Sequence, residues 1–231
     1  MDKKIAVITP VYNSENYIDK CLETVKNQTY SNLTHYVYDD ASCDGTVDVI
    51  NNYSGHDVCL IQSNKNRGQS FARNTLIAAA LADNCSYVAF LDSDDWWSAT
   101  HLEENLVFLN KANLVFSTPQ CISETGVSLW PTFFIPDEFS GVHLNKGNYI
   151  WISSVLADIK CFVDHKFITE FNSIEDWDMW LQLYHSGFKL IKQPTPTSFY
   201  LIRPVSEKNR GHSIVSKIYE KYKHLNEHET Q

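Results

Sequence analysis

The first 120 residues alternate short apolar runs with segments in which apolar side chains recur every three or four residues. A strand buried on both faces of a sheet gives a continuous apolar run, and the helix that crosses over to the next strand gives the periodic segment. The predicted strands are IAVIT (5–9), THYVY (34–38), VCLIQ (58–62), YVAFL (87–91) and LVFST (114–118). The pattern therefore predicts an α/β fold with a mostly parallel, Rossmann-like central sheet flanked by helices.

Four helices are predicted from the same spacing rule. The first begins near Ile18, and the other three cover residues 68–84, 101–111 and 174–186. A short strand is expected at KLIKQ (189–193), whereas residues 121–150 have no sustained period and are expected to be partly extended.

Several polar residues are placed to end these helices. Asn13 or Ser14 is expected to cap the first helix, and Thr100 with Glu103 forms a capping box before the third. Gly187 is expected to end the last helix, since glycine readily adopts the left-handed conformation found there.

Three regions follow from this pattern. Residues 1–120 form the main α/β half, residues 121–206 form a smaller region, and residues 207–231 form a tail with apolar residues at helical steps. The charges of the tail nearly cancel, so we expect an amphipathic helix that docks on the protein rather than on a membrane.

Composition excludes several classes of protein. The net charge of −9 disfavours nucleic acid as a partner, because a phosphate backbone requires a basic surface. The six cysteines form no C-x-x-C pair, which favours reduced, buried thiols over zinc or disulfides. No apolar run reaches about 18 residues, and the N-terminus becomes polar early. We therefore expect a cytoplasmic protein.

Polar residues follow each of the first four predicted strands, at the edge where open parallel sheets bind ligands. Two of these stretches are acidic: Asp39 with Asp40, and FLDSDD at residues 90–95. Hard carboxylate oxygens near Arg67 and Arg73 suit Mg²⁺ or Mn²⁺ shared with a phosphorylated ligand. An Asp-x-Asp pair also arises by chance, so the pair alone leaves metal binding and a bland surface role both open.

Neither a G-x-G-x-x-G loop nor a P-loop is present in the sequence, so a bound phosphate would be met by a cation and arginine side chains.

Taken in order, five motifs resemble those of the family 2 glycosyltransferases. They are TPVYN (9–13), DDASCDGT (39–46), NRGQSFARN (66–74), FLDSDD (90–95) and EDWDMWLQL (175–183). The resemblance covers about residues 3–200 and implies the GT-A fold, with a nucleotide-sugar-binding half followed by an acceptor-binding half.

The resemblance also implies roles for individual residues. Pro10, Val11 and Tyr12 would line the nucleotide base, and Asp40 would hydrogen-bond the base or its ribose. Arg73 would face the base or the diphosphate.

In the D-x-D motif of the family, the last carboxylate binds the metal, which corresponds to Asp94. Asp92 would reach the ribose or the water shell of the metal, and Ser93 would lie beside the nucleotide. Asp95 would support its neighbours or link to the following loop.

Asp176 corresponds to the catalytic base of the family. An acceptor hydroxyl becomes a good nucleophile only when its proton is removed in the transition state, whereas a metal-bound diphosphate leaves without an acid. From the residues alone, Asp176 could instead cap a helix together with Ser173. The four tryptophans near these motifs are expected to be core residues: Trp96, Trp97, Trp177 and Trp180.

The resulting prediction is an inverting glycosyltransferase. It would move a sugar from a UDP-sugar donor to a hydroxyl of a glycan or lipid-linked acceptor, in cell-surface polysaccharide or lipopolysaccharide-type synthesis. Mn²⁺ or Mg²⁺ would be the cofactor, and the protein would work in the cytoplasm or peripherally at the inner membrane face. A non-catalytic sugar-nucleotide-binding module and a sugar-1-phosphate nucleotidyltransferase are the alternatives, and the sequence is compatible with an oligomer.

Overall fold

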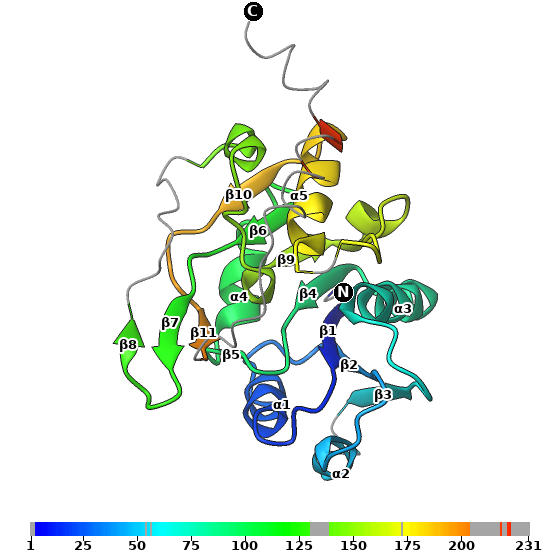
Figure 1. The fold of residues 1–231 in the computed structure, drawn as a ribbon. Coiled ribbons are helices and arrows are strands. Elements are labelled where there is room, and N and C mark those ends of the chain that lie inside the picture. The colour runs from blue at the N-terminus through cyan, green and yellow to red at the C-terminus, as the bar shows by residue number, and fades with distance from the viewer. Residues whose placement is uncertain are drawn as a thin grey trace, which may run out of the picture.

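A computed structural model describes residues 3–53, 55, 57–129, 139–171, 173–203, 218, 221 and 222. Within these residues, the central sheet has seven strands in the order β10-β6-β9-β4-β1-β2-β3 (Figure 1). Their bounds in chain order are β1 Ile5–Val11, β2 Leu33–Asp39, β3 Val58–Gln62, β4 Tyr87–Phe90, β6 Leu114–Phe116, β9 Leu156–Asp158 and β10 Leu190–Lys192.

The sheet is mainly parallel, as predicted. β1 pairs in parallel with β2 and β4, β2 pairs in parallel with β3, and β10 pairs in parallel with β6. β9 is the exception, since it lies antiparallel between β4 and β6. The sequence did not reveal β9.

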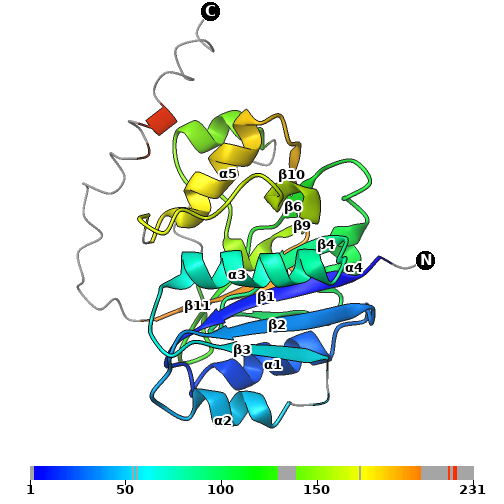
Figure 2. The same ribbon diagram turned by 90° about the vertical axis from the view of Figure 1, so that its right-hand side faces the viewer.

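Helices cover both faces of the sheet (Figure 2). α1 (Ile18–Lys26) and α2 (Thr46–Asn51) lie on one face, and α3 (Gln69–Ala82) lies on the other. Side chains alternate along β1, so Ile5 and Val7 join the core under α1 while Ala6 and Ile8 join the core under α3. The two remaining α-helices in the described residues are α4 (His101–Leu106) and α5 (Glu175–His185), and three short 3₁₀ helices are η1 (Gly141–Asn145), η2 (Ile152–Ser154) and η3 (Ile159–Phe162).

The helix starts differ from the prediction. Tyr17 is the residue before α1 and makes no side-chain capping bond, and the Ser14 hydroxyl contacts Ser93 and the Tyr12 carbonyl instead. Thr100 precedes α4, but its hydroxyl donates to Glu104 rather than capping a backbone N–H.

One helix end differs from the prediction and another agrees with it. α4 ends at Leu106, earlier than predicted, and the chain continues in turns through residue 111. α5 ends as predicted: Gly187 has a φ of 82°, and Phe188 N–H donates to the Leu183 carbonyl.

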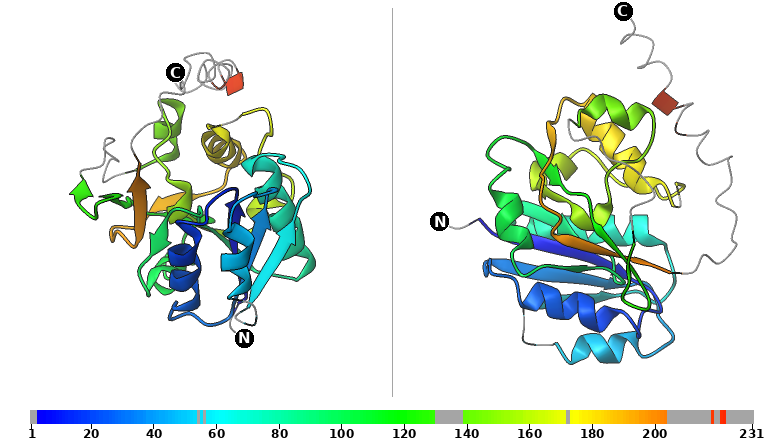
Figure 3. Two further views of the ribbon diagram at one scale, coloured as in Figure 1. Left: turned by 60° about the horizontal axis from the view of Figure 1, so that its bottom comes forward. Right: turned by 90° about the vertical axis from the view of Figure 1, so that its left-hand side faces the viewer.

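A second, smaller sheet lies beside the first and has the order β5-β11-β7-β8 (Figure 3). Its strands are β5 Trp96–Trp97, β7 Gln120–Ser123, β8 Ser128–Leu129 and β11 Ser198–Ile202. β11 runs parallel to β7 and antiparallel to β5. This sheet brings Arg203, the residue that follows β11, to the loop that follows β4.

Residues on both sides of position 120 build the central sheet, since β9 and β10 come from the second half, so the two predicted regions share one framework. Of the predicted tail, the structure describes Ile218, Lys221 and Tyr222. Ile218 and Tyr222 are buried beside α5, and the Tyr222 hydroxyl donates to Asp178 at 2.9 Å. Among the described residues, no helix combines the length and apolar character needed to cross a bilayer.

Candidate active site

The loops that follow β1 and β2 are tied to each other at the carboxyl edge of the sheet. Asn13 N–H donates to Ser42 Oγ, and the Asn13 side-chain oxygen accepts from Cys43 N–H, both at 2.9 Å. Asn13 and Ala41 have positive φ angles of 48° and 65°. Such angles are uncommon for residues other than glycine and cluster at functional sites.

The predicted base-binding residues Pro10, Val11 and Tyr12 lie in this edge. Val11 is buried within β1, whereas the Tyr12 side chain is 49% exposed. Tyr12 is thus a half-exposed aromatic side chain at the strand end, a residue type that can stack on a planar ring.

Asp40 is buried and organises the neighbouring loop. Its two carboxylate oxygens accept hydrogen bonds from the backbone N–H groups of Arg67 and Gly68, each at 2.7 Å. These residues precede α3, so Asp40 fixes where that helix begins. The predicted contact of Asp40 with a base or ribose stays a prediction, and the contacts present are with the protein backbone.

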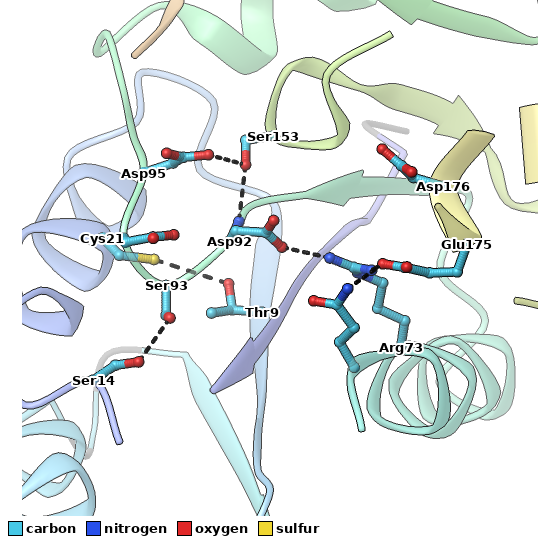
Figure 4. Close-up of polar contacts among 12 residues, drawn as sticks. Thr9, Ser14, Cys21, Arg73, Asp92, Ser93, Asp95, Ser153, Glu175 and Asp176 are labelled. Carbon is cyan, nitrogen blue, oxygen red and sulfur yellow. Dashed lines mark hydrogen bonds and ion pairs between the residues drawn. The ribbon is translucent and has the colours of Figure 1, made fainter. Parts of the chain in front are cut away.

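The acidic residues after β4 point in different directions (Figure 4). Asp92 Oδ1 accepts from Arg73 at 2.7 Å, and Ser93 Oγ contacts Ser14 Oγ at 3.0 Å. Asp95 is buried and accepts from Ser153 Oγ at 2.5 Å and from the Leu201 N–H at 3.0 Å. Asp95 thus links the loop to η2 and β11, as predicted for a supporting residue.

Asp94 faces a different partner. Its Oδ2 accepts from Arg203 Nη2 at 2.5 Å, and the Arg203 guanidinium lies over the Tyr17 ring. Burial and the nearby Asp92 raise the pKa of Asp94, and Arg203 opposes this change. Asp94 also lines a pocket of about 310 Å³ between α1 and the second sheet. The other residues that line this pocket are Asn16, Tyr17, Lys20, Trp96, Ile122, Ser123, Glu124, Gly126 and Leu201.

Arg73 joins the acidic loop to α5. Its side chain is 1% exposed, Nη2 donates to Asp92, and Nη1 donates to Glu175 Oε1 at 2.7 Å. Gln69 donates to the same Glu175 oxygen. The predicted contact of Arg73 with the base or the diphosphate stays a prediction, and the contacts present place its guanidinium between two carboxylates. The cause is electrostatic, since a buried guanidinium requires paired anions.

Glu175 is a site residue that the sequence did not single out. It is buried, and its Oε2 has no hydrogen-bond partner. Its position directly before Asp176 was the available signal, but nothing local to Glu175 indicates a partner 102 positions away.

Asp176 is the second residue of α5 and lies next to Glu175 at the same edge (Figure 4). Its Oδ2 accepts from Asn148 Nδ2 at 2.9 Å, and its Oδ1 accepts from the Trp177 N–H at 2.7 Å. Burial and the charge of Glu175 raise the pKa of Asp176 to about 7, against the opposing effects of Arg73, Asn148 and Trp177. The capping arrangement with Ser173 is not formed, because Ile174 precedes the helix and makes no capping bond.

The donor set suits a divalent cation only in partnership with a ligand. The described residues contain no group of three or more histidine, cysteine, aspartate or glutamate side chains that could hold a metal. Asp94 offers one partly exposed carboxylate, and Mg²⁺ or Mn²⁺ at nucleotide sites commonly takes one or two protein carboxylates together with phosphate oxygens. The residues present therefore fit a cation shared with a diphosphate.

The tryptophans have the predicted core roles where they are buried. Trp97, Trp177 and Trp180 are at most 4% exposed, while Trp96 stacks on Phe199 and carries the Lys20 ammonium over its ring. His212 and Ser213 lie outside the described residues.

A mainly parallel sheet with an aspartate-rich loop after β4 and a carboxylate at the start of α5 is an open α/β fold whose candidate site lies at the carboxyl edge of the strands. The family model of Glycosyl transferase family 2 matches residues 6–165. The chain belongs to this family.

Curated relatives agree with the family. The chain is 27% identical over 198 residues to UDP-Glc:alpha-D-GlcNAc-diphosphoundecaprenol beta-1,3-glucosyltransferase WfaP of Escherichia coli, covering 86% of this chain and 77% of that protein. It is 30% identical over 182 residues to the enzyme WfgD of the same organism, which carries the same description and is covered to 70%. It is 29% identical to the putative teichuronic acid biosynthesis glycosyltransferase TuaG of Bacillus subtilis, with 80% of this chain and 73% of that protein covered.

Solved structures show the GT-A fold. The S. aureus TarS fragment 1-349 in complex with UDP-GlcNAc superposes with a TM-score of 0.77 at 19% identity, over 94% of this chain and 66% of that one. The mannosyltransferase PcManGT from Pyrobaculum calidifontis, in complex with GDP-Man and Mn²⁺, superposes with a TM-score of 0.70 at 16% identity, over 97% of this chain and 65% of that one. The chain thus spans slightly less than two thirds of the length of these structures.

Proposed function

We propose that the chain is an inverting, metal-dependent glycosyltransferase that uses a UDP-sugar as donor and a hydroxyl of a glycan or lipid-linked acceptor. The observation that supports this proposal is the pairing of the buried Arg73 with both Asp92 and Glu175, which links the acidic loop to the start of α5, where the base candidate Asp176 lies. Asp92 and Glu175, which are 83 positions apart in the chain, thereby meet at one edge of the sheet.

Each end of this edge has a separate task. Asp94 would hold Mg²⁺ or Mn²⁺ together with the diphosphate of the donor. When bound, the cation would neutralise the diphosphate and so improve it as a leaving group. Tyr12, with Pro10 and Val11 beneath it, would receive the nucleotide base, and Ser93 and Asp92 would face the ribose side of the nucleotide.

Asp176 would act on the acceptor. Its carboxylate takes the proton of the acceptor hydroxyl as that oxygen bonds to the anomeric carbon and the bond from that carbon to the diphosphate oxygen breaks. One displacement of this kind inverts the anomeric configuration. A pKa near 7 suits a base at neutral pH, because about half of the group is ionised there and the carboxylate is basic enough to accept a proton.

The choice of donor and acceptor is supported by the relatives. WfaP and WfgD are described as using UDP-Glc and a diphosphoundecaprenol-linked acceptor. TarS structures contain UDP or UDP-GlcNAc. A lipid-linked acceptor would place the protein in the cytoplasm, peripherally at the inner membrane face, in cell-surface polysaccharide synthesis.

The proposal is tested by calorimetric titration of UDP into the protein, with Mn²⁺ and with EDTA, on wild type and Asp94→Ala. We expect binding that requires both Mn²⁺ and Asp94. Asp176→Asn is then expected to bind UDP normally and to lose transfer from UDP-sugars by about 10²- to 10⁴-fold. Metal-independent UDP binding would contradict the role of Asp94, and full activity of Asp176→Asn would contradict the role of the base.

A further inference from the structure

The side chain of Asn148 contacts Asp176 from outside α5. Its Nδ2 donates to Asp176 Oδ2 at 2.9 Å, while its Oδ1 accepts from the backbone N–H of Ile150 at 3.2 Å. A backbone N–H can only donate, so the amide oxygen must face Ile150 and the NH₂ group must face the carboxylate. The chain itself therefore fixes which way this amide points.

α5 holds the segment that carries Asn148. Trp177 Nε1 donates to the Leu144 carbonyl at 2.8 Å, and Trp180 Nε1 donates to the Ile150 carbonyl at 3.2 Å. Both indoles are buried, so losing either bond would leave an unsatisfied polar group in the core. The two anchors lie on either side of Asn148 in the chain, which makes the base and its amide partner parts of one packed unit.

Asp176 has a second donor of its own. Its Oδ1 accepts from the Trp177 N–H, so each carboxylate oxygen is held by one donor, and the two donors come from different elements. Rotation of the carboxylate would break both bonds. Each oxygen can accept two hydrogen bonds, which leaves a lone pair on each for an acceptor hydroxyl.

Among the described residues, the charged groups that act on Asp176 are Glu175 from α5 and Arg73 from α3. Glu175 disfavours the ionised carboxylate, and Arg73 favours it. Most of the Arg73 charge is already matched by Asp92 and Glu175. The Asn148 amide, by contrast, donates to Asp176 and to no other acidic side chain among the described residues.

We propose that Asn148 is a positioning residue for the transfer reaction, whose amide holds the Asp176 carboxylate in one orientation and keeps it ionised to receive the proton of the acceptor. This role rests on the proposed function, in which Asp176 is the base. Asn148 itself contacts neither the donor nor the reacting atoms. It lies in the second half of the chain, in a stretch for which the sequence predicted no regular structure.

The test compares Asn148→Ala and Asn148→Asp with wild type. Asn148→Asp keeps the size of the side chain and the acceptor for Ile150, but it replaces the donor with a like charge. The first readout is the pKa of the Asp176 carboxyl, measured by NMR in protein labelled with ¹³C-aspartate. The Asp176 signal is assigned as the one that Asp176→Asn lacks. We expect Asn148→Ala to raise this pKa by about 0.5 to 1 and Asn148→Asp to raise it further.

The second readout is UDP release from a UDP-sugar as a function of pH. We expect the acid limb of the kcat profile to move to higher pH in both variants, with the donor KM within about twofold of wild type. At pH 7, kcat should be about two- to fivefold lower in Asn148→Ala and lower still in Asn148→Asp. Asn113→Ala is the matched control, because Asn113 Oδ1 also accepts a backbone N–H, that of Lys189 at 2.9 Å, but at the start of β6. This control is expected to change stability without moving the pH profile.

Two failures are distinguishable. Wild-type turnover in Asp176→Asn would overturn the proposed function, whatever Asn148→Ala does. If Asp176→Asn is inactive while folded Asn148→Asp has the wild-type pKa of Asp176 and the wild-type pH profile, the function stands and the positioning role of Asn148 is overturned.

Discussion

Arg203 Nη2 lies 2.5 Å from Asp94 Oδ2, so the proposed metal ligand is paired with a cationic side chain of the protein. The Arg203 side chain is 50% exposed and reaches Asp94 from the residue that follows β11. A divalent cation at Asp94 must displace or share this partner.

Removing Arg203 is therefore expected to strengthen metal binding. We predict that, with UDP present, Arg203→Ala lowers the Kd for Mn²⁺ by about two- to fivefold, the range expected for the loss of one partly exposed competing ion pair. Calorimetry or electron paramagnetic resonance of free Mn²⁺ measures the change. Arg67→Ala is the charge-matched control, because the Arg67 guanidinium stacks on Phe71 rather than on a carboxylate. Equal or weaker Mn²⁺ binding by Arg203→Ala would show that the pair does not compete with the cation.

The buried guanidinium of Arg73 is expected to be essential for stability. Arg73→Met leaves Asp92 and the buried Glu175 without a counter-charge, and we expect the free energy of unfolding to fall by about 3 to 5 kcal/mol. Urea denaturation measures it. The double variant Arg73→Met with Glu175→Gln should recover part of the loss, since the uncompensated buried charge is removed. A double variant no more stable than Arg73→Met would point to packing rather than charge.

The raised pKa of Asp176 predicts opposite pH dependences for activity and stability. Activity should rise with pH through about 7, because the base must be ionised. The contribution of Asp176 to folding stability is fully present below its unfolded pKa, about 4, and is lost as pH rises through about 7, because the folded state binds the proton more tightly. At pH 8, Asp176→Asn should therefore unfold at higher urea than wild type, with the difference shrinking at pH 5. The same difference at both pH values would argue against a raised pKa.

Gly141 lets η1 approach α5 closely. A Cβ built on Gly141 would overlap the ring of Tyr184, whereas one on Gly147 would first meet the Tyr149 ring at 3.7 Å, an ordinary contact. We predict that Gly141→Ala costs about 1 to 3 kcal/mol of stability, as overpacked sites typically do, and that Gly147→Ala stays within about 0.5 kcal/mol of wild type. Thermal unfolding of the two variants side by side gives the comparison. Similar losses in both would indicate a general effect of adding a Cβ in this segment rather than the clash.

Local pattern was sufficient for much of the fold. The strands β1 to β4, the helix α3 and the end of α5 at Gly187 lie where apolar runs, helical spacing and a terminal glycine predicted them. The aspartates that follow β2 and β4 could also be placed at one edge, because parallel strands share the edge at which they end. These features depend on residues within one or two turns of each other, which a sequence records directly.

The caps show where local pattern fails. Ser14 and Thr100 are good capping residue types, yet their hydroxyls bind Ser93 and Glu104 instead. A hydroxyl takes whichever partner the packed structure brings within reach, so residue type limits its partners without choosing among them.

The sequence by itself determined the type of fold and the acidic groups available for catalysis. Only the tertiary structure decided their partners: Glu175 for Arg73, Asn148 for Asp176 and Arg203 for Asp94, at separations of 102, 28 and 109 residues. Such pairs leave no periodic trace along the chain, because they form only when β9 enters the central sheet and β11 joins the second one. Burial then makes each pairing energetically decisive, since a charge removed from water must find a partner at the position the fold provides.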